Sequence, residues 1–102
     1  MIVKVNNGKV DVYNDKGSKI RIIAGPSNAI SADCNSSQNL ILITRANGTV
    51  DLFDDKGSKK LTINAPVSAN NARFNGNDIA VHQRDGKTAI YNRSGSKIKI
   101  IP

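Results

Sequence analysis

Short runs of alternating apolar and polar residues follow one another along the chain, separated by turns. Between residues 39 and 78 such runs cover 39–45, 49–54 and 60–63, and a weaker one covers 68–74. Alternation with a period of two places successive side chains on opposite faces of a strand. The pattern therefore predicts four short antiparallel strands joined by turns.

This four-strand pattern is repeated. The segment 8–19 recurs as 48–59 and as 86–97, at offsets of 40 and 38 residues. Repeats of this period are typical of blades, solenoid coils or arrays. Asn-Gly and Asp-Gly favour hairpin turns in which both central residues have positive φ. These dipeptides occupy one position in all copies, as Asn7-Gly8, Asn47-Gly48 and Asp85-Gly86.

Aligning the copies divides the chain into one repeat domain with units at about 1–23, 24–63 and 64–102. The alignment matches residues 2–4 with 42–44 and 80–82, and Pro26 with Pro66. It predicts eleven strands, as two sets of four and one set of three. The strand missing from the first set is the one that would precede Met1.

Four-strand units of about 40 residues with a hairpin signal at each corner resemble the blades of a β-propeller. The stretch 72–81, followed by 85–91, is similar to the inner-to-outer run of a blade. The resemblance covers the whole chain but is generic, because the Gly-His and Trp-Asp marks of WD-type repeats are absent. It implies an all-β, propeller-like fold of four-stranded antiparallel meanders, about three blades per chain. The alternative is a pseudo-threefold closed barrel or prism that resembles a trimmed β-trefoil.

Three blades are too few for a closed ring, since propellers typically have four to eight. Two open faces, each of several hundred Å², would remain exposed to water. Burying such a face is favourable by roughly 25 cal/mol per Å² of apolar surface. We therefore expect the chain to bind itself, as a homodimer that closes a six-bladed ring about a two-fold axis. The absent strand is an objection, because it would be the innermost of its blade. A piece of a longer propeller is a further alternative, because the chain ends at Pro102 in phase with the repeat.

Composition agrees with the all-β class. The chain has 102 residues, neither Glu nor Trp, and many Asn, Gly and Asp residues, which favour turns over helices. The single Cys34 excludes an intrachain disulfide. No apolar stretch has the length of a signal peptide or a membrane span, so we expect a cytoplasmic protein without membrane contact.

The net charge of +7, from 15 Lys and Arg against eight Asp, permits binding to nucleic acid or another acidic partner. The competing explanation is solubility and protection of sheet edges. Basic residues gather around the repeated Gly-Ser-Lys turn and the strand that follows it, where alternation in 97–100 predicts lysines outward and isoleucines inward. The candidate polyanion-binding residues are Lys16, Lys19, Lys56, Lys59, Lys60, Arg93 and Lys97, with Arg21 and Lys99 in the same group.

Three of the four aromatic residues, Tyr13, Phe53 and Tyr91, occupy one position of the repeat. They would form either a stacking platform for sugars or bases, or a packing slot between neighbouring units. Packing is the favoured interpretation. A small oligomeric lectin is the weaker alternative, because sugar sites are usually rich in Trp.

The sequence predicts no enzyme, cofactor or metal site. His82 is the only histidine, and Cys34 has no activating partner and is expected to be a small buried residue. Asp11 and Asp51 recur, but the third copy has Ala89 in their place, so we expect them to be outward-facing strand residues. The sequence thus favours a non-catalytic binding or scaffolding module, with polyanion binding as the first alternative.

Overall fold

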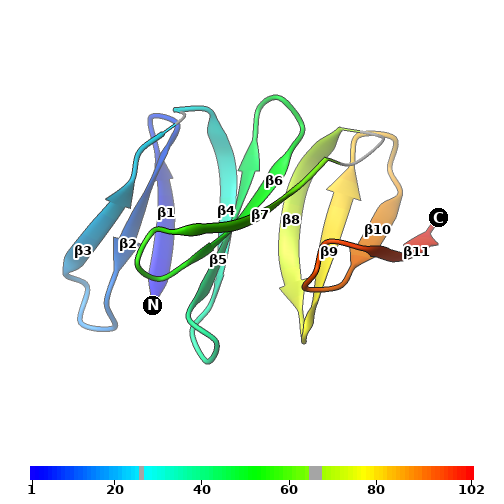
Figure 1. Cartoon of the computed structure of the whole chain (residues 1–102). Helices are drawn as coiled ribbons and strands as arrows, with labels where there is room; N and C mark the ends of the chain where they lie inside the picture. The colour runs from blue at the N-terminus through cyan, green and yellow to red at the C-terminus, as the bar shows by residue number, and fades with distance from the viewer. Residues whose placement is uncertain (26, 65–67) are drawn as a thin grey trace.

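The computed structural model describes residues 1–25, 27–64 and 68–102, so the matched Pro26 and Pro66 lie outside the described residues. The described residues form eleven β-strands and no helix (Figure 1). The strands form three separate sheets, and within each sheet a strand pairs antiparallel with its neighbours in sequence. No helix in this part of the chain is long and apolar enough to cross a membrane.

The three sheets are called blades 1, 2 and 3. Blade 1 consists of β1 (Ile2–Asn6), β2 (Lys9–Tyr13) and β3 (Lys19–Ile23). Blade 2 consists of β4 (Ala29–Asn35), β5 (Leu40–Arg45), β6 (Val50–Asp54) and β7 (Lys59–Ile63). Blade 3 consists of β8 (Ala69–Asn75), β9 (Asp78–Gln83), β10 (Thr88–Tyr91) and β11 (Lys97–Ile101).

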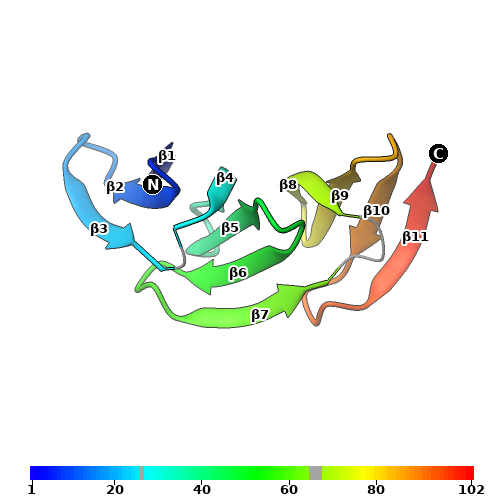
Figure 2. The same ribbon diagram turned by 90° about the horizontal axis from the view of Figure 1, so that it is seen from above.

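The blades stand side by side in an arc (Figure 2). Strands β1, β4 and β8 lie toward the concave side, and β3, β7 and β11 form the convex side. The all-β class and the antiparallel meanders are confirmed. The closed-barrel alternative is wrong, because no strand of one blade pairs with a strand of another among the described residues.

The apolar core lies between the blades, in two layers. Alternation along β5 sends Ile41 and Ile43 toward blade 1 and Leu42 toward blade 3. All six residues of β5 are buried, so this strand is covered on both faces. Each large aliphatic side chain buried in this way contributes about 1.5–3 kcal/mol relative to an exposed one.

The hairpin turns differ in length. The loop between β1 and β2 has two residues, Asn7 and Gly8, with φ of 53° and 78°. In the turn between β5 and β6, three residues, 46–48, separate Arg45 from Thr49, whose carbonyl accepts a hydrogen bond from the Arg45 N–H over 2.9 Å. Of these three, only Gly48 has positive φ, at 90°. In the third hairpin the positive φ is that of Gly86, at 88°. The expectation of two positive φ values is right for the first turn and wrong for the other two.

The shorter first loop moves β1 by one residue relative to the alignment. Ile2 pairs with Tyr13, just as Ile41 pairs with Phe53, so Ile2 takes the place of Ile41 and not of Leu42. Because side chains alternate across a strand, a shift of one residue exchanges the two faces. The match of residues 2–4 with 42–44 and with 80–82 is therefore wrong by one position.

The outer strand β11 also departs from expectation. All five of its residues are exposed, including Ile98 at 53% and Ile100 at 45%. The predicted inward orientation of these isoleucines is wrong, because these positions of the outer strand lie outside the apolar layers. The equivalent residues Ile20 and Ile22 of β3 and Lys60 and Thr62 of β7 are exposed as well.

Neighbouring blades are joined by the same backbone hydrogen bond at both junctions. The N–H of Ala29 donates to the Gly8 carbonyl over 2.9 Å, and the N–H of Ala69 donates to the Gly48 carbonyl over 3.1 Å. The approach is close enough that a Cβ on Gly48 would lie 2.7 Å from the Cβ of Ser68. A glycine is thus required here both for its φ and for the space.

Replacing Gly48 by alanine should destabilise the fold more than replacing Gly86 by alanine. Both glycines have φ near 90°, but a Cβ on Gly86 meets nothing within 4 Å. In each variant the free energy of unfolding should fall by about 1–2 kcal/mol, because alanine is strained in the left-handed backbone conformation. Gly48→Ala loses a further amount of about 1–3 kcal/mol from overpacking between blades. Urea unfolding measures both, and equal losses would contradict the close blade contact.

Candidate functional site

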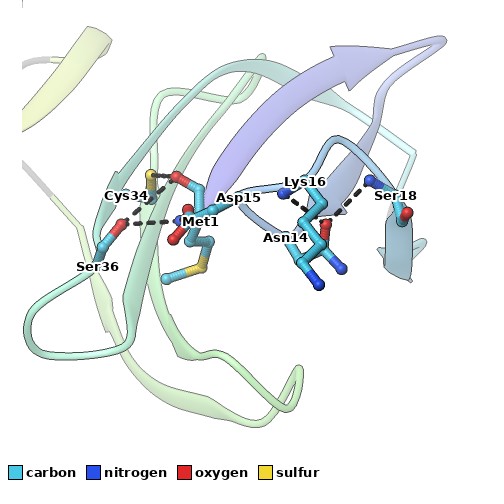
Figure 3. Close-up of polar contacts among 7 residues, drawn as sticks. All are labelled: Met1, Asn14, Asp15, Lys16, Ser18, Cys34 and Ser36. Carbon is cyan, nitrogen blue, oxygen red and sulfur yellow. Dashed lines mark hydrogen bonds and ion pairs between the residues drawn. The ribbon is translucent and has the colours of Figure 1, made fainter.

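The repeated Gly-Ser-Lys corner is a structural turn. In the first copy the Asn14 Oδ1 accepts hydrogen bonds from the backbone N–H groups of Lys16 and Ser18, each 3.0 Å long (Figure 3). Asp54 and Asn92 make the same pair of bonds in the other copies. Asn and Asp side chains favour turns because they can bond to their own backbone in this way. Turn chemistry therefore accounts for the strongest repeated signal in the sequence.

The predicted polyanion-binding residues lie at these corners and on the outer strands β3, β7 and β11. Two of them have acidic neighbours: Lys19 Nζ is 3.6 Å from Asp11, and Lys59 Nζ is 3.8 Å from Asp51. The structure distributes the group over the three blades, as Lys16 and Lys19, then Lys56, Lys59 and Lys60, then Arg93 and Lys97. Polyanion binding through this group stays a prediction.

Arg93 has a local role. Its guanidinium lies over the Phe74 ring, 5.3 Å from the centroid, and donates to the Gly76 carbonyl over 3.3 Å and to the Gln38 side chain. Gln38 belongs to the β4–β5 loop of blade 2, so this arginine helps to join blades 2 and 3. These contacts occupy much of its capacity to bind a phosphate.

Asp51 is the centre of a buried polar network. Arg45 Nε lies 3.1 Å from Asp51 Oδ2, and Thr62 Oγ1 donates to Asp51 Oδ1 over 2.7 Å. The Arg45 guanidinium also lies 5.9 Å from the centroid of the Phe53 ring. The expectation that Asp11 and Asp51 face outward is wrong, since both are 4% exposed. Each carboxylate is instead close to cationic or amide groups: Asp11 to Asn6 and Lys19, and Asp51 to Arg45 and Lys59.

The three blades fill this position differently. In blade 1, Asn6 Nδ2 lies 3.4 Å from Asp11 Oδ2, so an amide replaces the guanidinium. In blade 3, Gln83 takes the place of Arg45, and Ala89 takes the place of the aspartate. The three blades thus have three different residue pairs at this position, which indicates a role in packing and not a reactive group that is repeated in each blade.

A hollow of about 210 Å³ lies between β4 and β8 toward the concave side. Ser31 Oγ donates to Asn71 Oδ1 across it over 2.8 Å. Both oxygens of Asp33 are engaged by backbone, because the N–H groups of Cys34 and Phe74 each donate to one over 2.9 Å. The residues that line it are Ser31, Ala32, Asp33, Asn71, Ala72 and Arg73.

The hollow is lined mainly by polar residues and alanines, and its polar side chains could hydrogen-bond a partner. The exposed charge at its wall is that of Arg73. The described residues contain no cluster of three His, Cys, Asp or Glu side chains that could hold a metal ion. Sequence reasoning missed the hollow. The segments 29–35 and 69–75 share a pattern of small and polar residues that could have indicated it. The pattern is hard to recognise because apolar and polar residues alternate only weakly in both segments.

Neither His82 nor Cys34 is among the residues that line the hollow. His82 Nδ1 is 3.0 Å from Thr88 Oγ1 on blade 3. Cys34 is half-buried, not fully buried as expected, and its Sγ lies 3.3 Å from the Met1 carbonyl oxygen (Figure 3). Burial, together with the negative charge of Asp33, raises the pKa of the Cys34 thiol above its ordinary value. The thiol is therefore mainly protonated at neutral pH, which slows its reaction with electrophiles.

The aromatic position of the repeat is a packing slot where a neighbouring blade covers it. Phe53 and Tyr91 are each 5% exposed and belong to the two apolar layers. Tyr13, in the same position of blade 1, is only half-buried. The packing interpretation is thus confirmed for Phe53 and Tyr91.

Comparison with known proteins identifies the fold. No protein-family model matches the chain, and no curated protein sequence matches it significantly. Similar solved structures include Sqt1 of Saccharomyces cerevisiae, with a TM-score of 0.78, 20% identity, and 94% of this chain and 28% of that chain covered. Another is BamB of Moraxella catarrhalis, with a TM-score of 0.77, 14% identity, and 96% and 31% covered. The chain thus spans less than a third of the length of these β-propeller proteins, and the predicted propeller-like fold is confirmed.

Removing the carboxylate of Asp51 should strongly destabilise the fold. Asp51→Ala leaves the Arg45 guanidinium buried without that countercharge, which costs about 3–5 kcal/mol. The double variant Arg45→Gln/Asp51→Ala copies the Gln83 and Ala89 pair of blade 3 and should recover most of the loss. Chemical denaturation measures both variants. A double variant as unstable as Asp51→Ala would show that the network matters for more than its charge balance.

Proposed function

We propose that the chain is a non-catalytic binding or scaffolding module whose two end blades bind further blades, in the simplest case those of a second copy. The observation that carries this proposal is a contrast between equivalent positions. Residues that are buried between blades in the middle of the arc are exposed on its two end faces.

The first end face belongs to blade 1. Ile2 is 52% exposed, whereas the equivalent Ile41 and Ile79 are both at 0%. Tyr13, on the same face, is half-buried where Phe53 is 5% exposed. This surface has the side chains of an interface between blades, but no blade of the described chain covers it.

The second end face belongs to blade 3. Ile101 is 48% exposed, whereas the equivalent Ile63 is 3% and Ile23 is 6% exposed. The Gly86 carbonyl occupies the place of the Gly8 and Gly48 carbonyls, which accept the hydrogen bonds between blades. Among the described residues no N–H donates to it from a following blade.

The polar substitutions on the two end faces are complementary. Lys4 replaces the aliphatic residues Ile43 and Val81 on the face of blade 1. On the face of blade 3, Thr88 stands in the place of Val10 and Val50. When the two faces meet, the Lys4 ammonium could donate a hydrogen bond to the Thr88 hydroxyl oxygen. The same polarity keeps each face soluble when they are apart.

Two copies joined face to face in this way form two identical junctions related by a two-fold axis. Each junction would use the same type of contact that joins blade 1 to blade 2 and blade 2 to blade 3. A six-bladed ring lies within the four to eight blades typical of closed propellers. In this arrangement the concave hollow between β4 and β8 faces the ring axis, where a partner would be held.

The mass in solution tests the proposal. Light scattering coupled to size exclusion should give twice 10.9 kDa, or 21.8 kDa, at concentrations where the faces meet. Ile2→Asp and Ile101→Asp should each weaken the dimer by tenfold or more, because each places a charge in an apolar contact worth about 1.5–3 kcal/mol.

Ile30→Asp is the matched control, since Ile30 is 45% exposed but lies on the middle blade. It should leave the dissociation constant unchanged. A chain that remains at 10.9 kDa at every concentration, or an equal effect of all three variants, would contradict the ring.

A further inference from the structure

Among the described residues, no strand lies beside β1 at the position that β4 and β8 occupy in the other two blades. In the other blades the equivalent strands β5 and β9 are paired on both sides, with β4 and β6 and with β8 and β10. β1 pairs with β2 alone among the described residues. Its other edge therefore presents backbone N–H and C=O groups that can pair with an added strand.

We propose that this edge binds an extended segment of another polypeptide as a fourth strand. Addition of a strand to an open sheet edge is a recurrent mode of peptide recognition, in which backbone hydrogen bonds give affinity and alternate side chains give specificity. The inference concerns β1 itself and does not require the ring proposed above.

The complete blades indicate what the segment should look like. β4 and β8 hold this position in blades 2 and 3, and each has seven residues. Both read Ala, any residue, Ser or Asn, Ala, Asp or Arg, Cys or Phe, Asn. A small residue at the first position and an apolar residue at the sixth position therefore fit the site, whereas the residue preferred at the fourth position depends on the β1 residue opposite it.

The pairing register follows from the other blades. In blade 2, Ala29, Ala32 and Cys34 of β4 lie opposite residues 45, 43 and 41 of β5. Because Ile2 takes the place of Ile41, the first, fourth and sixth residues of the segment lie opposite Asn6, Lys4 and Ile2.

Lys4 gives the site a charge preference. The equivalent residues Ile43 and Val81 are buried and apolar, whereas Lys4 is exposed. An acidic residue at the fourth position of the segment would lie directly opposite the Lys4 ammonium, and opposite charges across a strand pair stabilise it. The net charge of +7 attracts acidic segments as well. The favoured occupant is therefore an extended segment with Asp or Glu at its fourth position.

Cys34 provides a reporter at one end of the site. Its Sγ contacts the Met1 carbonyl, and the Met1 ammonium lies 2.5 Å from Asp15 Oδ1 and 3.1 Å from Ser36 Oγ (Figure 3). A strand that extends along β1 to Met1 ends beside this cluster and covers the thiol. In the ring, the first N–H of the segment would also face the Gly86 carbonyl of the neighbouring copy, a contact that does rest on the proposed function.

The test uses the chain itself and a capped peptide of residues 69–75, the sequence of β8, with an Ala72→Asp form and an Ala72→Lys form. Fluorescence anisotropy gives the affinities at concentrations up to millimolar. The Ala72→Asp peptide should bind about two- to five-fold more tightly than the unchanged peptide. Bound peptide should slow alkylation of Cys34 in proportion to occupancy.

Lys4→Glu is the matched protein variant, because Lys4 is exposed. It places a second carboxylate opposite Asp11, the partner of Lys4 on β2, so circular dichroism first checks that the variant is folded. This variant should reverse the preference, so that the Ala72→Lys peptide binds more tightly than the Ala72→Asp peptide. A peptide N-methylated at alternate amides cannot form the ladder and should not bind.

The proposal is overturned if no peptide binds, if N-methylation has no effect, or if Lys4→Glu leaves the charge preference unchanged. Protection of Cys34 that rises with protein concentration in the absence of peptide also overturns it, in favour of a second copy at this edge. Peptide binding by a chain whose mass stays at 10.9 kDa supports this inference while the ring fails. A dimer that binds no peptide supports the ring and overturns this inference.

Discussion

The structure depends on one constraint: each blade is a sheet with two apolar faces, and both faces must be covered. Blade 2 meets this requirement, because β5 is buried along its whole length between the side chains of blades 1 and 3. Blades 1 and 3 meet it on one face only. The hydrogen bonds from Ala29 and Ala69 to the carbonyls of Gly8 and Gly48 set the spacing at which this coverage is achieved.

The constraint separates structural from functional features. Buried polar groups such as Arg45 and Asp51 are neutralised within the layers, and the repeated Asn14, Asp54 and Asn92 turns are closed by their own side chains. What remains for recognition is the concave hollow, the end faces and the edge of β1.

The fold could be predicted from the sequence because each copy of the repeat carries local signals for its strands and turns. Alternation indicated the strands, and the Asn-Gly and Gly-Ser corners indicated the turns. The errors have a common cause, since each concerned a contact between strands or blades. Asp11 and Asp51 are polar strand residues whose burial depends on groups from neighbouring strands, such as Lys19 and Arg45. The shift of Ile2 arises from one missing loop residue. The hollow is formed by two strands 40 residues apart, whose weak alternation hid the shared pattern.

Hydrogen exchange followed at several protein concentrations tests this account most directly. If coverage of both faces controls stability, amides of β5 and β6 should exchange slowest at every concentration. Amides of β1, β2 and β10 should exchange faster in dilute solution and become protected as concentration rises, because the end faces then meet their partners. Equal protection of all three blades, independent of concentration, would contradict the claim that the end blades are incomplete.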